Sequence, residues 1–376
     1  MLPLDGVRVL DLTRLLPGAV ATQYLRDFGA EVIKIEQPVT GDYARQFLSV
    51  AGKTPVFTAT NRGKKSVVLD LTKPHARDVM VRLVERTDVL IDGFRPGVMA
   101  RLGLSYDRLR SRNPRLIGVA ITGYGQSGPY RDLVGHDLNY LSLAGVLDLI
   151  GPKDGAPVIP GVQIADLAGG AMQAVVGVLL ALAARERTGE GQFVDVSMMN
   201  GSAALLVFPL AYLHAAGRPS ERGNDTLSGR YACYNVYRCS DDRWISVGAL
   251  ESKFWATLCR ELGCPELIED QYAEEPRQSE VKTAIADVFR QRAAEEWFTL
   301  LGKKDCCVTP VRTLAEVAHD PHFESCPIGI IPKLASTPAE LHEVSPQLGE
   351  HTTEVLSSAG YTPQQIEELQ RCRVIR

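Results

Sequence analysis

Short apolar segments and helices alternate over the first 200 residues, and this alternation restricts the fold more than any other feature of the sequence. Pro17 and Gly18 favour the start of a helix that ends before Gly29, and a strand is expected on either side of it. Strands that alternate with helices predict an α/β fold with a Rossmann-like, mostly parallel sheet and helices on both of its faces. Such a sheet binds ligands at the carboxyl ends of its strands. The predicted strands are residues 7–12, 31–35, 66–69, 89–91 and 116–122.

The pattern changes after residue 218, where a second and smaller α+β domain is predicted. Segments 231–236 and 243–247 indicate a hairpin, and helical stretches follow them. The tail over residues 349–369 is helical again and is assigned to the first domain. The predicted division is a large α/β domain over residues 1–200 and 330–376, a linker over 201–224, and a small α+β domain over 225–329.

Composition identifies an ordinary globular protein. Among 376 residues, 41 are Lys or Arg and 45 are Asp or Glu, so the formal net charge is −4, and 45% of the residues are hydrophobic. This balance excludes a disordered chain and a strongly basic nucleic-acid binder. The first residues do not resemble a secretory signal and the last do not resemble a peroxisomal or lipidation signal, so a cytoplasmic location is expected.

The eight cysteines are too sparse for a disulfide scaffold in a chain of this length. They form no CxxC pair and no ligand-like spacing with histidines, which favours reduced thiols and disfavours a metal site. They are Cys233, Cys239, Cys259, Cys264, Cys306, Cys307, Cys326 and Cys372.

Two long runs carry no formal charge, at residues 167–184 and 198–216. Runs of this length are candidates for spanning a membrane. Both contain polar residues, such as Gln173 and Asn200, and Pro209 interrupts the second. We therefore expect two helices buried on all sides, in a large core or in a subunit interface, and no membrane contact.

Two segments partly match known motifs, one for dinucleotide binding and one for a catalytic serine, but the residues around them do not fit the structure that either motif requires. Residues 123–128 match G-x-G-x-x-G, but Pro129 and the residues after it indicate a loop where a dinucleotide-binding protein has a helix. Ser127 lacks the second glycine of a nucleophile elbow, because Pro129 occupies that position. Binding of nicotinamide or flavin is not expected.

Cations on either side of two predicted strands are candidates for binding a polyanion. Arg62, Lys64 and Lys65 come before one strand, and Arg95 and Arg101 come after another. Cations at the edge of a parallel sheet suit a ligand with several phosphates. The alternative is solvated surface charge.

Several segments together resemble the family III CoA-transferase and α-methylacyl-CoA racemase superfamily. The resemblance implies a CoA thioester as substrate, no separate cofactor, no nucleic-acid partner and an interlocked homodimer. It also supplies the polyphosphate that the cations would bind. The matching segments are residues 4–11, 29–36, 61–66, 94–97, 123–125, 187–192 and 348–351.

The racemase branch of this superfamily implies roles for individual residues. His136, in residues 135–140, matches one catalytic base, and Asp166 matches the aspartate that both branches use. Glu251 matches a glutamate that supports the site from the small domain of the other subunit. The resemblance further implies CoA or substrate binding by Gln37, Leu69, Asp70, Leu71, Thr72, Gly93, Phe94, Arg95, Arg101, Gly135, Asp137, Leu138, Asn139 and Tyr140.

Inversion of the carbon next to a thioester carbonyl needs an acid and a base on opposite faces of that carbon. The ordinary pKa values, about 6.5 for His and about 3.9 for Asp, differ by more than two units. We therefore expect partial burial to raise the pKa of Asp166. Backbone N–H groups of residues 166–170 are candidate donors to the enolate oxygen.

Structural roles for the same residues remain open alternatives. Asp166 precedes a predicted helix and is a favoured N-cap. His136 can be a loop residue, with Asp137 capping the next helix. Glu251 can occupy the first turn of its helix.

The leading function is racemisation of 2-methylacyl-CoA thioesters. The sequence does not specify which acyl group the thioester carries. The first alternative is CoA transfer between carboxylic acids, with Asp166 as the nucleophile. The second is a non-catalytic CoA-binding protein. A base at His136 separates racemisation from transfer, because transfer does not need one.

Overall fold

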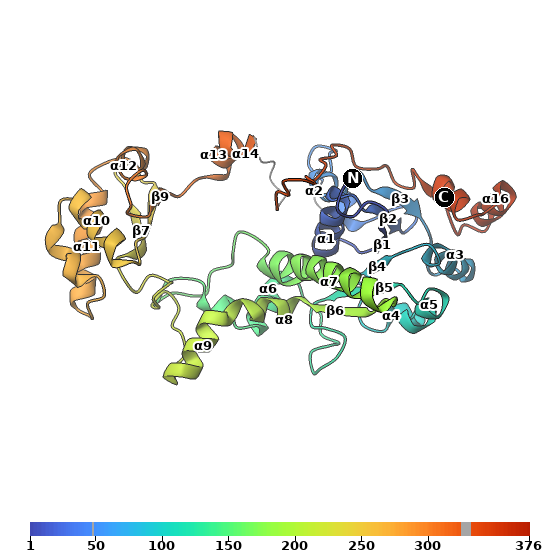
Figure 1. Ribbon diagram of the computed structural model, residues 1–376, viewed down its shortest axis with the longest axis horizontal. Coiled ribbons are helices and arrows are strands. Elements are labelled where there is room, and N and C mark those ends of the chain that lie inside the picture. Colours follow the sequence, from blue (N-terminus) through green and yellow to red (C-terminus); the bar gives the residue numbers. More distant parts are fainter. Residues whose placement is uncertain (47–48, 325–331) are drawn as a thin grey trace. The chain divides into compact units, whose positions relative to one another are not determined.

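The computed structural model describes residues 1–46, 49–324 and 332–376, and the chain divides into two compact units (Figure 1). The first unit comprises Met1–Val146, Pro160–Leu206 and Gly329–Arg376, and the second comprises Leu147–Ile159 and Val207–Ile328. The domain limits expected from the sequence stay a prediction. Their boundary at 329–330, like Cys326, lies outside the described residues.

In its described part, the first unit contains a sheet of six strands in the order β3-β2-β1-β4-β5-β6. All neighbouring strands pair in parallel, which confirms the predicted α/β fold. The sequence did not predict β6, which follows the long helix α7 (Met172–Thr188). The strands are β1 (Arg8–Leu12), β2 (Glu31–Glu36), β3 (Lys65–Val68), β4 (Val89–Asp92), β5 (Ile117–Thr122) and β6 (Phe193–Ser197).

The strand order reverses beside β1. The chain runs from β1 through β2 to β3, and then returns to β4 on the other side of β1. Leu12 is paired with Asp92, so the carboxyl ends of β1 and β4 lie together. Ligands of open parallel sheets bind outside the carboxyl ends of the strands at such a reversal.

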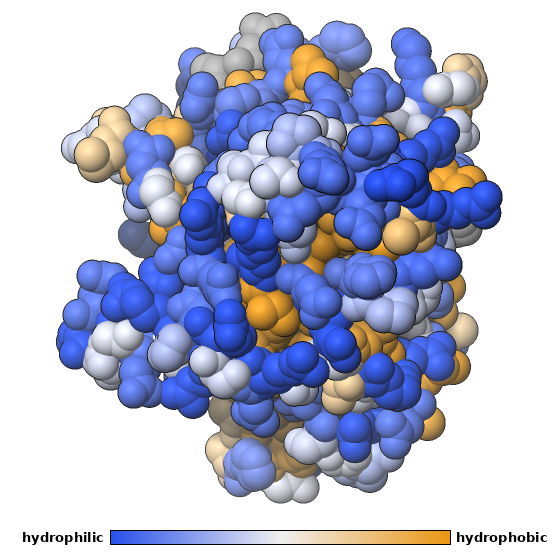
Figure 2. Space-filling view, turned by 90° about the vertical axis from the view of Figure 1, so that its right-hand side faces the viewer, coloured by the Kyte–Doolittle hydropathy of each residue, from blue (hydrophilic) through white to orange (hydrophobic). Residues whose placement is uncertain are grey.

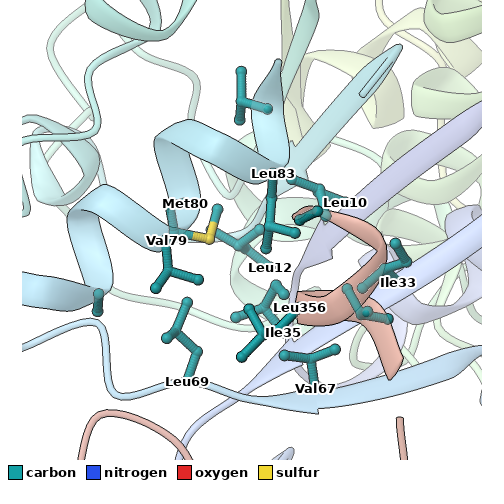
Figure 3. Close-up of a cluster of buried hydrophobic side chains, with 14 of the residues drawn as sticks. Leu10, Leu12, Ile33, Ile35, Val67, Leu69, Val79, Met80, Leu83 and Leu356 are labelled. Carbon is teal, nitrogen blue, oxygen red and sulfur yellow. The ribbon is translucent and has the colours of Figure 1, made fainter. Parts of the chain in front are cut away.

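One face of the sheet is covered by an apolar core. Leu10 and Leu12 of β1 pack with Met80 and Leu356 from two covering helices (Figure 3). The C-terminal segment also pairs with the sheet, because the Asp70 N–H donates to the Val374 carbonyl at 2.8 Å. The helices on this face are α3 (Pro74–Val84), α5 (Tyr106–Arg112), α15 (Thr352–Ser358) and α16 (Pro363–Arg371). Hydrophilic residues cover most of the side that carries α3 and α16 (Figure 2).

The helices on the other face are α1 (Leu16–Asp27), the π-helical segment η3 (Ala165–Ala171), α7 (Met172–Thr188) and α8 (Met198–Ala203). The backbones of η3 and α8 lie in direct contact. A Cβ atom added to Gly201 would lie 2.1 Å from the Gly169 carbonyl oxygen, and one added to Gly169 would lie 2.6 Å from the Met198 oxygen. Only glycine permits this approach, which fixes the segment that carries Asp166.

A network of buried charges lies under this second face. Lys34 contacts Asp42 at 2.8 Å, and Lys64 contacts Asp11 at 3.3 Å, with all four side chains fully buried. Although burial opposes ionisation, the positive charges of Lys34 and Lys64 hold the pKa of Asp11 at about 2. Buried ions persist only when they are paired and hydrogen-bonded, so this network is part of the fold.

The second unit is built on an antiparallel sheet, β7 (Tyr234–Arg238), β8 (Trp244–Gly248) and β9 (Val308–Pro310), which confirms the predicted hairpin and the small α+β fold. Its core includes Trp255, whose indole N–H donates to the Leu267 carbonyl at 3.1 Å. The helices packed there are α10 (Ser252–Glu261), α11 (Arg277–Phe289) and α12 (Ala294–Leu301).

Short elements complete the described chain. They are η1 (Tyr43–Arg45), α2 (Pro55–Asn61), α4 (Val98–Arg101), α6 (Asp137–Leu143), η2 (Leu147–Leu149), η4 (Ala204–Leu206), α9 (Val207–Ala216), η5 (Pro265–Asp270), α13 (Leu314–Ala318) and α14 (Pro321–Glu324).

The two uncharged runs form helices, but the chain's own core does not bury them. Helical stretches Ala165–Thr188 and Met198–Ala216 are long and apolar enough to cross a membrane, with 33% and 17% of their apolar windows buried. Leu180 of α7 and Val207 of α9 are 66% and 73% exposed. The prediction that the core of a single chain buries both helices was therefore wrong, because apolar composition does not specify what covers a helix. The expected subunit interface and cytoplasmic location stay predictions.

Candidate functional site

A cavity of about 520 Å³ lies where the loops after β4 and β5 meet the start of α6. Its size is within the usual range for small-molecule sites. Parallel strands bring these loops to one edge of the sheet, although they are distant in the sequence. The cavity brings together seven of the expected residues, Gly93, Phe94, Arg95, Gly135, His136, Asn139 and Tyr140.

The backbone at His136 is fixed by the beginning of α6. His136 is the N-cap residue, its N–H donates to the Asn139 Oδ1 at 3.1 Å, and the Asn139 N–H donates to the His136 carbonyl at 2.8 Å. The Tyr140 hydroxyl donates to the Gly135 carbonyl. The alternative in which Asp137 caps this helix is wrong, because Asp137 is the first residue within it. The imidazole itself is exposed.

Asp137 connects the His136 segment to Asp166. Its Oδ1 accepts a hydrogen bond from the Asp166 backbone N–H at 2.9 Å. Asp166 lies in the first turn of η3, whose N-cap is Ile164 with no side-chain cap. The N-cap alternative for Asp166 is therefore wrong, and capping does not occupy its carboxylate.

The electrostatics of Asp166 differ from those of an ordinary aspartate. Burial, and after it the negative charge of Asp137, raises the pKa of Asp166 to about 6. Burial, followed by the charge of Asp166, also raises the pKa of Tyr140 to about 12. Tyr140 lines the cavity, whereas Asp166 is not among its lining residues. A carboxyl group that titrates near the ordinary pKa of histidine can both accept and return a proton near neutral pH.

Two of the expected enolate donors already have acceptors. The Asp166 N–H donates to Asp137, and the Leu167 N–H donates to the Gln163 carbonyl at 3.0 Å. The expectation was wrong for these two groups, since the π-helical turn and Asp137 satisfy them.

Cations that follow β4 and β5 gather around one loop. A Cβ atom at Gly97 would lie 3.4 Å from Nη1 of Arg101 and 3.9 Å from Nη2 of Arg131. Neither Arg95 nor Arg101 forms an ion pair with any described residue. These guanidinium groups are available to an anionic ligand at the carboxyl edge of the sheet.

Cations that precede β3 are paired within the protein. Arg62 contacts Asp27 at 2.8 Å, Lys64 contacts Asp11 at 3.3 Å, and Lys65 contacts Glu31 at 2.9 Å. Their expected role in binding a polyanion was wrong. They lie at or before the amino end of β3, where the fold supplies a carboxylate for each.

The remaining expected nucleotide contacts lie after β2 and β3. The Gln37 side chain donates to the Thr40 hydroxyl at 2.6 Å, so a local contact already uses it. The Thr72 hydroxyl donates to Asp70 Oδ1 at 2.6 Å and shapes the loop that contains Leu71. Leu69 is buried in the core, and Leu138 is exposed on α6.

Glu251 lies in the second unit as the N-cap residue of α10 and is exposed. The preceding carbonyl, of Leu250, accepts hydrogen bonds from Gln271 at 2.8 Å and from the Tyr272 hydroxyl. The alternative that places Glu251 inside the first helical turn was wrong by one residue. Its catalytic role stays a prediction.

Several residues near this site were not predicted from the sequence. Tyr124, Arg131 and Met198 line the cavity, and Arg14 stacks near Phe94. A signal was present for Arg14, a cation directly after the first strand, and for Arg131, a cation in the loop after the fifth. Met198 gave none, since it begins an uncharged run.

The described cysteines are all free, and most are buried in the second unit. In residues 1–46, 49–324 and 332–376, no group of three or more His, Cys, Asp or Glu side chains is placed to hold a metal ion.

Similar proteins fall into one family. The family model described as CoA-transferase family III matches residues 4–352. The human α-methylacyl-CoA racemase is 36% identical over 387 aligned positions, which cover 99% of this chain and 97% of that protein. The succinyl-CoA–D-citramalate CoA-transferase of Chloroflexus aurantiacus is 32% identical, with coverage of 99% and 98%.

Two solved structures have a similar fold. A CAIB/BAIF family protein from Brucella suis has a TM-score of 0.82 at 28% identity, covering 95% of this chain and 99% of that one. Rv3272 from Mycobacterium tuberculosis has a TM-score of 0.80 at 35% identity, covering 94% and 98%. The chain therefore belongs to CoA-transferase family III and is an α-methylacyl-CoA racemase-like enzyme.

Proposed function

We propose that this enzyme racemises 2-methylacyl-CoA thioesters, with His136 and Asp166 as the two proton-transferring groups. The observation that supports the proposal is a hydrogen bond between the segment of His136 and the segment of Asp166. Asp137, the residue after His136, binds the Asp166 backbone at 2.9 Å, and its charge contributes to the raised pKa of Asp166. One short segment thus positions one group and adjusts the acidity of the other.

The reaction moves one proton off the α-carbon and another onto its opposite face. One group accepts the α-proton, and the electrons of the broken C–H bond move onto the thioester oxygen as an enolate. The other group, protonated beforehand, then delivers its proton to the α-carbon. The raised pKa of Asp166, about 6, makes this carboxyl group a better proton acceptor and donor near neutral pH than an ordinary aspartate. Two side chains suffice, and the CoA belongs to the substrate.

The CoA portion is proposed to lie along the carboxyl edge of the sheet, with Arg95 and Arg101 contacting its phosphates. Their lack of carboxylate partners among the described residues supports this role. The acyl chain is proposed to occupy the 520 Å³ cavity beside His136. The lining combines polar residues, such as Arg131 and Asn139, with apolar ones, such as Leu133 and Val134. Apolar contacts discriminate chain length weakly, so a range of acyl groups is expected.

A homodimer is proposed to complete the site. Apolar residues are exposed on α7 of the first unit and on α9 of the second, for example Leu180 and Val207, and a second copy would cover them. Glu251 from the small domain of the partner subunit would then support the imidazole of His136.

CoA transfer is the second candidate function, because Asp166 is also the residue that a transferase would use as nucleophile, and similar proteins include CoA-transferases. Attack of its carboxylate on the thioester would give an acyl-aspartyl anhydride and free CoA thiolate. His136 in the cavity favours racemisation, because transfer requires no base at that position.

The experiment incubates the enzyme with an (S)-2-methylacyl-CoA in deuterium oxide, without any carboxylic acid acceptor. Racemisation predicts deuterium at the α-carbon and formation of the (R) epimer, detected by mass spectrometry and chiral separation. Absence of exchange, combined with CoA transfer once an acid acceptor is added, would establish transfer instead.

A further inference from the structure

Arg14 lies at the point where the strand order reverses, two residues after the end of β1. Its guanidinium carbon is 5.2 Å from the centre of the Tyr43 ring and 5.5 Å from that of Phe94. Nη1 also donates to the Tyr43 hydroxyl at 3.1 Å. Because Phe94 lines the candidate cavity, these contacts hold the Arg14 guanidinium at its edge.

The backbone before Arg14 is held by the buried charge network. The Thr13 N–H and hydroxyl both donate to Asp11 Oδ1, at 2.9 and 2.6 Å. The Thr13 carbonyl accepts from the Lys34 ammonium at 3.0 Å. A Cβ atom at Gly18 would lie 2.2 Å from the Thr13 Cβ, so the first turn of α1 packs directly on this residue.

The residue after Arg14 is held in a strained conformation. Leu15 has a φ of 61°, which is uncommon for a residue with a side chain, and its N–H donates to Asp42 Oδ1 at 3.0 Å. Asp42 is in turn paired with Lys34 at 2.8 Å. Strain of this kind persists only where the surrounding structure enforces it, and it is concentrated at functional sites. The fold therefore fixes the backbone on both sides of Arg14.

The charge of Arg14 has no carboxylate partner in the part of the chain that the structure describes, whereas Arg45 and Arg62 in the same unit pair with Glu36 and Asp27. Two aromatic rings restrict its movement and leave guanidinium N–H groups unused. A preorganised guanidinium with unused donors suits bidentate binding of a phosphate.

We propose that Arg14 binds a phosphate group of the CoA thioester and is a binding residue in addition to Arg95 and Arg101. The inference rests on the proposed function for the identity of the ligand. The expected ligand is an organic phosphate. The part of the ligand attached to the phosphate would extend to the loop that contains Phe94. The buried network of Asp11, Lys34 and Asp42 positions Arg14 and does not itself contact the ligand.

The test measures binding of CoA by titration calorimetry to the wild type, Arg14→Gln and Arg14→Lys. Removal of one charge-assisted contact predicts a Kd for CoA that is roughly 10- to 100-fold higher in Arg14→Gln. Arg14→Lys retains the charge but loses the planar donor pair, so an intermediate Kd is expected. The Kd for pantetheine, which lacks phosphate, should be the same in all three proteins.

Arg110→Gln is the matched control, because Arg110 is an exposed arginine paired with Glu190 at the surface. It should bind CoA as the wild type does. Thermal unfolding of each variant verifies folding. An unchanged Kd for CoA in a folded Arg14→Gln would overturn the inference and leave the proposed function intact. A wild type that binds no CoA would overturn both.

Discussion

Asp137 Oδ1 accepts the backbone N–H of Asp166 at 2.9 Å, across 29 positions of the chain. This hydrogen bond holds the first turn of η3 against the first turn of α6, where His136 is the N-cap. It also places a negative charge near the Asp166 carboxyl, which contributes to the rise of its pKa to about 6. A single side chain thus affects both the position and the acidity of the proposed catalytic aspartate.

Asp137→Asn should separate these two effects, because the amide oxygen can still accept the hydrogen bond but the charge is gone. The pKa of Asp166 should fall from about 6 toward its ordinary value, although burial, the larger cause, still keeps it raised. In the direction in which Asp166 accepts the proton, activity falls as the pH falls through this pKa. The acid limb of that pH profile should therefore move to lower pH.

The measurement is the initial rate of α-deuterium incorporation from each epimer as a function of pH. Asp132→Asn is the control, because Asp132 is a highly exposed aspartate in the loop before α6. Its profile should match the wild type. An acid limb that stays in place in Asp137→Asn would contradict the electrostatic role.

Gly201→Ala tests the close contact between η3 and α8. The new methyl group would lie 2.1 Å from the Gly169 carbonyl, and overpacking against backbone costs about 1–3 kcal/mol of the free energy of unfolding. Alanine regains at most about 1 kcal/mol from helix propensity, so net destabilisation is expected. Urea unfolding measures it.

Gly161→Ala is the matched control, since no atom lies within 4 Å of the position that its Cβ would take. It should change the free energy of unfolding by less than about 0.5 kcal/mol. Equal stability of the two alanine variants would show that the backbones of η3 and α8 are not in contact.

Asp11 should make stability depend on acid pH. Its pKa in the folded protein is about 2, below the ordinary value of 3.8, so its contribution is complete above about pH 4 and is lost as the pH falls toward 2. The shift corresponds to about 2 kcal/mol of the free energy of unfolding. Asp11→Asn, which leaves Lys34 and Lys64 without this partner, should be destabilised by about 3–5 kcal/mol at neutral pH.

Urea unfolding of both proteins from pH 6 to pH 2 measures this dependence. The difference in stability between wild type and Asp11→Asn should narrow over the last two pH units. A constant difference would show that Asp11 does not titrate differently in the folded and unfolded states.

Arg101→Gln and Lys65→Gln compare an unpaired cation with a paired one. Arg101 has no carboxylate partner within the described chain, whereas Lys65 contacts Glu31 and Glu354. Arg101→Gln should raise the KM for an acyl-CoA by roughly tenfold or more, with little change in kcat. Lys65→Gln should leave KM unchanged. Equal effects of the two substitutions would contradict the assignment of cations by their pairing.

Periodicity in the sequence predicted five of the six strands, because short apolar runs between helices are a local signal. It missed β6, where Phe193 and Asp195 are exposed and the strand is only partly apolar. It also misplaced Lys64, since a lysine next to a strand gives no sign of a buried aspartate 53 residues earlier in the chain. The pairing partner of a charge is a tertiary property.

The same limit applies to the candidate site. The resemblance to a known family indicated His136 and Asp166, but not the hydrogen bond from Asp137 that connects their segments. The π-helical turn at Asp166 was hidden as well, because Gly169 and Gly170 only indicate close packing once the contact with α8 is known. Apolar periodicity likewise predicted the helices α7 and α9 without specifying what covers them.

The most direct measurement of the central claim is α-proton exchange by the single-base variants His136→Ala and Asp166→Asn in deuterium oxide. Loss of either group should slow interconversion of the epimers by about 100- to 10,000-fold. Each variant should still exchange the α-proton of one epimer, and the two variants should select opposite epimers, because the remaining base faces one side of the carbon. Exchange of the same epimer by both variants, or interconversion at the wild-type rate in either, would contradict the account.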